Sequence, residues 1–85
     1  MLLCYCDDHV FIADAKNKRV QVLKVNGSAK EQLAMIEAEL PVLDYESSIY
    51  TGEKIVDVDF VESKGLYSLS DNNGKILLKR KNEIA

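Results

Sequence analysis

The chain has 85 residues, a formal net charge of −3, and 47% hydrophobic and 29% charged residues. This length allows one domain at most, and the composition is too apolar for a disordered chain. The weak acidity argues against a dedicated nucleic-acid binder, which presents a large basic field, and no apolar run approaches the ~18 residues that a membrane helix needs.

The first residues, Met-Leu-Leu-Cys-Tyr-Cys, predict a short apolar strand at Leu2–Cys6. They lack the length and the flanking positive charge of a signal peptide. Cys4 and Cys6 lie too close along an extended strand to form a disulfide with each other. We therefore expect a cytoplasmic or nuclear protein, in a reducing compartment and without a membrane partner.

Two further strands are predicted at Val10–Ala13 and Val20–Val25, because both segments are rich in branched and aromatic residues. Asp7 and Asp8 form a polar turn before the first of them, and residues 16–18 form a turn before the second. The start of the chain is therefore typical of a three-stranded antiparallel meander.

A helix is predicted from Ser28 to about Leu40. Ser28 and Glu31 have the spacing of a capping box, in which each residue satisfies a free amide of the first turn. Pro41 ends the helix, because the residue before a proline is pushed out of the helical region. The apolar residues that share one face of this helix are Ala29, Leu33, Ile36 and Leu40.

The second half of the chain predicts further strands. Pro41–Tyr45 is expected to be a short edge strand and Glu46–Glu53 a polar loop. Lys54–Val61 alternates apolar and acidic residues, as a half-buried strand does. Leu66–Ser70 and Lys75–Arg80 form a hairpin across an Asp-Asn-Asn-Gly turn.

These elements together predict an α+β fold. It consists of one antiparallel sheet of about six strands, ordered as three strands, a helix and three strands, with the amphipathic helix packed on the sheet. Residues 1–81 are expected to form a single small domain, and residues 82–85 a frayed tail.

The two hairpins of the chain, at His9–Val25 and Gly65–Arg80, have similar sequences. Internal similarity of this kind is typical of a repeat fold. Phe11-Ile12-Ala13-Asp14, followed by Arg19-Val20-Gln21-Val22, resembles a blade of an NHL-type β-propeller. The later segment, with its strands at 55–60, 66–70 and 74–78, resembles a WD-repeat blade. Among such proteins, the chain looks most similar to the opening blades of the non-catalytic subunit of a tRNA methyltransferase.

This resemblance implies a propeller-like scaffold in an RNA-modifying complex. The chain departs from it in three respects: it has no tryptophan, it lacks the Gly-His and Trp-Asp signatures of WD repeats, and a helix is foreign to a blade. Two blades do not close a ring of about four to eight. Two structures therefore stay open, a complete small α+β domain or a part of a propeller that partner chains complete.

Cys4, Cys6 and His9 crowd together near the start, with two aspartates between them. These residue types bind zinc, but one Cys-X-Cys pair with a single histidine lacks the spacing of a structural zinc site. No nucleophile elbow or other catalytic motif accompanies His9. We therefore interpret the cysteines as core residues and predict a protein that is not an enzyme and has no metal and no cofactor.

Asp57 and Asp59 fall on one face of the predicted strand at Lys54–Val61. Paired carboxylates work as acid and base or hold a hard cation. Their alternation with apolar residues is explained more simply by a strand whose acidic face meets solvent.

Two kinds of side chain are candidates for contacts with partners. Tyrosine suits protein interfaces, because its ring is apolar and its hydroxyl is polar. Small clusters of cations suit phosphate groups. The candidate protein interface is Tyr45, Glu46 and Tyr50, and the candidate phosphate contacts are Lys16, Lys18, Arg19, Lys79, Arg80 and Lys81.

The sequence therefore favours a non-enzymatic protein-interaction module or small subunit of a larger assembly, whose strand edges accept a protein partner or a second copy. The alternative is an RNA-associated accessory subunit that uses its basic turns. A small metal-dependent enzyme built on Cys4, Cys6 and His9 is the third hypothesis.

Overall fold

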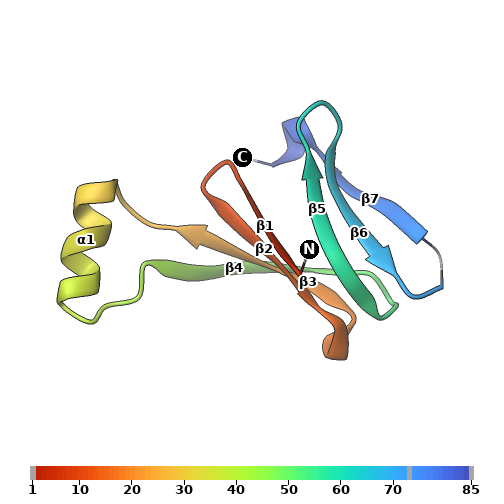
Figure 1. Cartoon of the computed structure of the whole chain (residues 1–85), viewed down its shortest axis with the longest axis horizontal. Helices are drawn as coiled ribbons and strands as arrows, with labels where there is room; N and C mark the ends of the chain where they lie inside the picture. The colour runs from red at the N-terminus through yellow and green to blue at the C-terminus, as the bar shows by residue number, and fades with distance from the viewer. Residues whose placement is uncertain (1, 73, 85) are drawn as a thin grey trace.

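The computed structural model of the protein describes residues 2–72 and 74–84. Figure 1 shows two layers of strands and one helix that stands away from them. The elements in chain order are β1 (Leu3–Cys6), β2 (His9–Asp14), the 3₁₀ turn η1 (Ala15–Asn17), β3 (Arg19–Val25), α1 (Ala29–Glu37), β4 (Leu43–Tyr50), β5 (Ile55–Val61), β6 (Gly65–Ser70), β7 (Gly74–Arg80) and the 3₁₀ turn η2 (Lys81–Glu83).

The strands form two antiparallel sheets. Sheet A contains β1 to β4 and sheet B contains β5 to β7, and in both sheets neighbours in sequence are neighbours in space. Strands make up 55% of the structure and helices 18%, so the protein is mostly β. The predicted α+β fold with one six-stranded sheet is therefore wrong. Alternating residues identify the strands, but they do not say which strands share a sheet.

The hydrophobic core lies between the two sheets. Sheet B packs on sheet A through β5, which contacts β1, β2 and β3. Phe11 and Val20 come from sheet A, and Ile55, Val58 and Leu66 from sheet B, and each is at most 1% exposed. Each sheet turns an apolar face inward, and stacking these two faces buries both without a helix.

Tight turns join the neighbouring strands at the positions that the sequence predicts. Asp7 and Asp8 adopt left-handed backbone with φ of 49° and 61°, and Lys18 does so with φ of 52°. Short polar residues tolerate this region better than branched ones. In the predicted Asp-Asn-Asn-Gly turn, Gly74 has φ of 68°, and Asn73 lies outside the described residues.

The helix α1 has the predicted start but not the predicted packing. The Oγ of Ser28 accepts a hydrogen bond from the Glu31 amide at 3.3 Å, which is one of the two bonds of the predicted capping box. The same hydroxyl donates to Oε1 of Glu31 at 3.3 Å. No residue of α1 is buried. The side chains that we expected to rest on the sheet are 58–60% exposed, namely Leu33, Ile36 and Leu40.

The position of α1 follows from the pairing of the strands on either side of it. β3 and β4 pair directly with each other, and the amide of Asn26 donates to the carbonyl of Val42 at 2.9 Å. The segment between β3 and β4 therefore projects beyond the end of sheet A, as Figure 1 shows. Amphipathic spacing predicts a helix with an apolar face, but not what covers that face.

The helix also ends earlier than predicted, at Glu37. Glu39 has φ of 58°, and the amide of Leu40 donates to the carbonyl of Met35 at 2.8 Å. This left-handed residue with its backward hydrogen bond is a Schellman motif. The left-handed backbone at Glu39 therefore terminates the helix before Pro41 is reached.

β4 is longer than predicted and extends into the segment that we expected to be a loop. The predicted edge strand at Pro41–Tyr45 and loop at Glu46–Glu53 are replaced by one strand, Leu43–Tyr50. This strand pairs with β3 over its whole length. The pairing satisfies the polar backbone of β3, which overrides the weak local preference of a serine-containing segment.

The expected frayed tail at 82–85 carries a core residue. Residues 81–83 form η2, and Ile84 is 8% exposed and belongs to the core cluster. Ala85 lies outside the described residues.

Candidate functional site

The face of sheet A that points away from the core carries an apolar row across all four strands. Tyr5 pairs with Val10, Val10 with Leu23, and Leu23 with Tyr45. Residues that are paired directly across strands project to the same face. Val10 and Leu23 are half-buried in the middle of the row, while the flanking Tyr5 and Tyr45 are 59% and 57% exposed.

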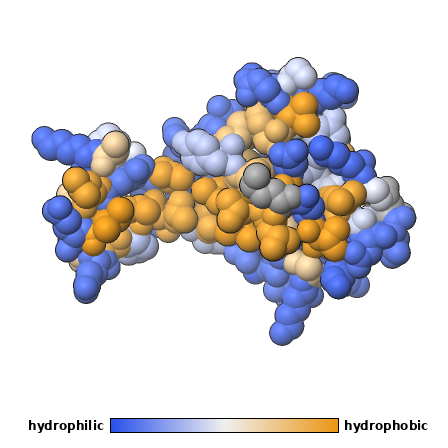
Figure 2. All heavy atoms as spheres, in the orientation of Figure 1, coloured by the Kyte–Doolittle hydropathy of each residue, from blue (hydrophilic) through white to orange (hydrophobic). Residues whose placement is uncertain are grey.

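Further apolar residues extend this row in both directions along the strands. Leu3 pairs with Ile12 on one side, and Val25 pairs with Leu43 on the other. Figure 2 shows hydrophobic side chains that run continuously from α1 along the β3–β4 ribbon and over sheet A. We call this surface the apolar face. Its residues are Leu3, Tyr5, Val10, Ile12, Leu23, Val25, Leu33, Ile36, Leu40, Leu43 and Tyr45.

The whole molecule is more open than its size requires. Its accessible surface is 5612 Å², whereas a folded monomer of 9.6 kDa exposes roughly 5,100 Å². Its radius of gyration is 13.8 Å, against roughly 12 Å for a compact domain of this length. The projecting ribbon and helix contribute to this open shape. Contiguous exposed apolar surfaces are typical of sites that bind a protein, a membrane or a ligand.

The structure divides the predicted interface residues between the two faces of sheet A. Tyr45 and Tyr50 lie on the outer face, and Tyr50 is 72% exposed. Glu46 is the extra residue of a β-bulge, because Val22 pairs with Ser47 and Leu23 already pairs with Tyr45. The bulge turns the side chain of Glu46 inward.

Glu46 meets the single histidine of the chain. Its Oε2 lies 2.8 Å from Nε2 of His9, which is 4% exposed, and Nδ1 of His9 donates to the carbonyl of Asp7 at 2.7 Å. His9 therefore ties the first turn of sheet A to its last strand.

Arg19, one of the predicted phosphate contacts, is held in a polar cluster on the outer face. Its Nε donates to Asp14 at 2.8 Å, and its Nη1 donates to the hydroxyl of Ser48 at 3.1 Å. Asn17 and Gln21 also donate to Asp14, both at 3.0 Å. Hydrogen bonds from Asn17, Arg19 and Gln21 lower the pKa of Asp14 to about 2. Arg19 is therefore occupied within the protein.

The two basic clusters lie at opposite ends of the body. Figure 1 places η1, with Lys16 and Lys18 exposed beside it, at the bottom of the view, and η2, after Lys79 and Arg80, at the top. They therefore form no single phosphate track.

The basic cluster at Lys79–Lys81 borders a hollow of about 730 Å³ at the end of sheet B. Arg80 and Lys81 line it, and the sequence interpretation missed Lys64 and Tyr67, which the pairing of β6 with β7 brings beside them. Lys79 instead lines a smaller hollow near His9. The complete lining is Asp7, Ser63, Lys64, Tyr67, Leu77, Arg80, Lys81 and Asn82.

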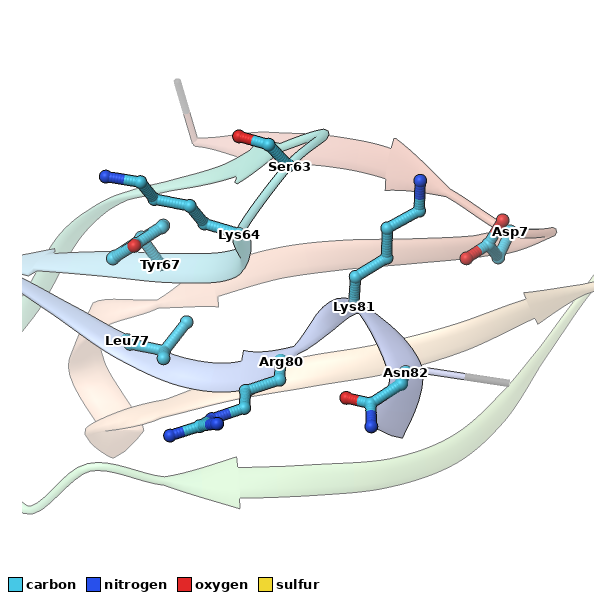
Figure 3. Close-up of a pocket in the computed structure, with 8 residues that line it drawn as sticks. All are labelled: Asp7, Ser63, Lys64, Tyr67, Leu77, Arg80, Lys81 and Asn82. Carbon is cyan, nitrogen blue, oxygen red and sulfur yellow. The ribbon is translucent and has the colours of Figure 1, made fainter.

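The side chains around this hollow do not converge. Figure 3 shows Lys64 and Lys81 rising on one side, whereas Arg80 points to the other. Glu62 accepts a hydrogen bond from the Nζ of Lys81 at 2.6 Å and raises the pKa of that ammonium group. The hollow is basic, but one of its cations is already paired.

Cys4 and Cys6 are buried in the core, and burial is the main cause that raises the pKa of each thiol to about 11. At neutral pH both are therefore protonated, whereas nucleophilic attack and metal binding require the thiolate. Within residues 2–72 and 74–84, no three His, Cys, Asp or Glu side chains are grouped so that they could hold a metal ion.

Asp57 and Asp59 lie on the face of sheet B that points away from the core. Asp57 Oδ1 accepts from the Val58 amide at 2.8 Å, and Asp59 Oδ1 accepts from the Phe60 amide at 2.9 Å. The Nζ of Lys75 lies 3.7 Å from Asp59 and 4.8 Å from the centre of the Tyr67 ring. These carboxylates are engaged in local backbone and surface contacts.

Comparison with protein-family models, with curated proteins and with solved structures gave no match. Among the described residues, α1 and the two 3₁₀ turns are all too short to cross a bilayer.

Proposed function

We propose that this protein is a non-enzymatic interaction module, a small subunit of a larger assembly, whose protein partner covers the apolar face. The observation that carries the proposal is the exposure of α1 together with the outer row of sheet A. Leu33, Ile36 and Tyr45 are each more than half exposed. Figure 2 shows hydrophobic side chains that continue from α1 over sheet A.

Energetics support this proposal. Full burial of a leucine or isoleucine contributes about 1.5–3 kcal/mol, so half of that gain is still available at each exposed position of α1. α1 has no buried side chain through which the fold would benefit. A partner that covers these side chains gains this burial free energy. The partner can also form backbone hydrogen bonds with β4, which is an edge strand of sheet A.

The resemblance to propeller blades supports the same proposal. Each sheet is a meander in sequence order, and the first strand of sheet B lies against the first strand of sheet A. In a propeller a blade is flanked by a blade on either side. Here the outer face of sheet A has no neighbour among the described residues, as an incomplete set of blades would leave it.

The proposal that the protein is not an enzyme is supported by the state of its reactive side chains. Both thiols have a pKa of about 11, and His9 is held by Asp7 and Glu46. Two free cysteines in the core also fit our proposal of a reducing compartment, cytoplasmic or nuclear.

A crosslinking experiment in the cells that make the protein tests the proposed function. A photoreactive amino acid replaces Ile36 or Tyr45. Lys54, which is exposed just before β5 of sheet B, serves as the control position. We expect protein adducts from the two apolar positions and none from the control. Equal yields from all three positions, or no adduct from any, would refute the proposal.

The basic hollow favours a second candidate function, an RNA-associated accessory subunit. Lys64 and Arg80 provide cations, and Tyr67 provides a ring on which a base can stack. Binding of a fluorescent oligouridylate should then weaken steeply with salt, and Lys64→Ala with Arg80→Ala should weaken it further. Lys16→Ala with Lys18→Ala is the matched control. A flat salt response removes this candidate.

A further inference from the structure

We propose that the apolar face is occupied by a second copy of this chain, related to the first by a two-fold axis so that their ribbons run antiparallel. This inference rests on the proposed function and names its partner. It is carried by the opposite charges at the two ends of the β3–β4 ribbon, which make the surface complementary to itself.

The end of the ribbon that bears α1 is acidic. In the segment at residues 26–42, one cation stands against three carboxylates, which gives a net charge of −2. The residues are Lys30, Glu31, Glu37 and Glu39, and all four are exposed.

The opposite end of the ribbon is basic. Around η1, three cations stand against Asp14, which gives a net charge of +2. Because Asp14 is paired with Arg19, Lys16 and Lys18 carry the uncompensated charge, and both are exposed. The seven residues of β3 separate the two ends by roughly 23 Å.

An antiparallel pair of ribbons brings these features into register. The apolar row from Tyr5 to Tyr45 lies near the middle, so it meets itself across the axis. The acidic end of each copy then lies over the basic end of the other, twice by symmetry. A parallel arrangement would oppose acid to acid and base to base.

The extra exposed surface amounts to more than half of what each partner of such a contact buries. The chain exposes about 500 Å² more than a compact monomer, which is over half of the ~800 Å² that each partner contributes to a stable interface. The apolar face also lacks charged residues in its centre, as interface cores do.

Sedimentation equilibrium of the full chain over a range of concentrations tests the proposal. We expect a monomer–dimer equilibrium that shifts toward monomer as salt is raised. Ile36→Glu with Tyr45→Glu should leave only monomer. Since both side chains are more than half exposed, circular dichroism should show the same fold.

Charge reversal tests the antiparallel geometry. Lys16→Glu with Lys18→Glu, or Glu37→Lys with Glu39→Lys, should each raise the dissociation constant by about tenfold or more, because two contacts change from attraction to repulsion. The four substitutions together should restore the dimer. Lys54→Glu with Lys64→Glu makes the same change in charge at the two turns that flank β5 and should have no effect.

Each other outcome overturns the inference. A chain that stays monomeric at every concentration excludes the second copy, while crosslinks to a different protein at Ile36 would still support the proposed function. A dimer that ignores the charge reversals excludes the antiparallel arrangement. Oligomers that grow beyond two copies exclude the two-fold axis.

Discussion

Gly65 begins β6 with φ of 139°, and the backbone of β7 lies directly beside it. A Cβ added at this position would stand 2.2 Å from the carbonyl oxygen of Lys79 and 2.9 Å from Cα of Arg80. Both are backbone atoms, so relief requires the end of β7 to move away by about an ångström. We therefore expect Gly65→Ala to destabilise the fold strongly.

The size of this effect can be estimated from its parts. Holding a non-glycine residue at such a φ costs about 1–3 kcal/mol. Opening the pairs of Gly65 with Arg80 and of Leu66 with Lys79 loses two ladder contacts, at about 1 kcal/mol each. The total is about 4 kcal/mol, a large part of the 5–15 kcal/mol that holds a typical domain together.

Gly52→Ala is the matched control. Gly52 also has positive φ, 77°, but no atom lies within 4 Å of its added Cβ, so only the backbone cost of about 1–2 kcal/mol applies. Urea unfolding followed by circular dichroism measures both variants. If the two variants lose the same free energy of unfolding, the close approach of β7 is not what makes Gly65 necessary.

Three further predictions concern the helix, the acid limit and the thiols. Leu33→Ala and Ile36→Ala should each change the free energy of unfolding of the monomer by less than about 1 kcal/mol, because both side chains are already exposed to solvent. Urea unfolding measures this change. A loss of about 2 kcal/mol or more would show that α1 packs on the two sheets. The pKa of Asp14 falls from 3.8 to about 2 on folding, so the carboxylate adds its full stabilisation of the fold above about pH 4 and loses it as the pH falls through about 2. In an acid titration, the unfolding free energy of Asp14→Asn should lack this pH-dependent loss. An acid transition that is the same in both proteins would contradict the prediction. At pH 8, alkylation of Cys4 and Cys6 should be about 100-fold slower in the folded protein than in the unfolded chain. The reason is that a rise in pKa from 9.0 to about 11 lowers the fraction of thiolate by about that factor. Similar alkylation rates in native protein and in urea would refute this prediction.

The strands could be predicted from the sequence because their signals are local. Alternation and turn residues located β2, β3, β5, β6 and β7 to within one or two residues. The division into two sheets depends on which strands meet after the turn at residues 51–54, and no local pattern carries that information. The capping box gave the start of α1 for the same local reason, while its exposure depends on the direct pairing of β3 with β4.

The candidate sites show the same limit. Tyr45 and Tyr50 were proposed from residue type, and register shows that both lie on the outer face while Glu46 turns inward at the bulge. Lys64 joins Arg80 only through the pairing of β6 with β7, although the hairpin register could have indicated it. The apolar face could not be predicted from the sequence, because its residues become neighbours only when the four strands pair in the observed register.

The direct pairing of β3 with β4 has a consequence for folding. Most strands in each sheet are joined to their neighbours by short turns, but residues 26–42 separate β3 from β4. Closing a loop of that length, rather than one of four residues, costs roughly 1 kcal/mol of chain entropy. Because no residue of α1 is buried, packing of the helix does not offset this entropy cost. The protein therefore maintains a segment that its stability in isolation would do better without.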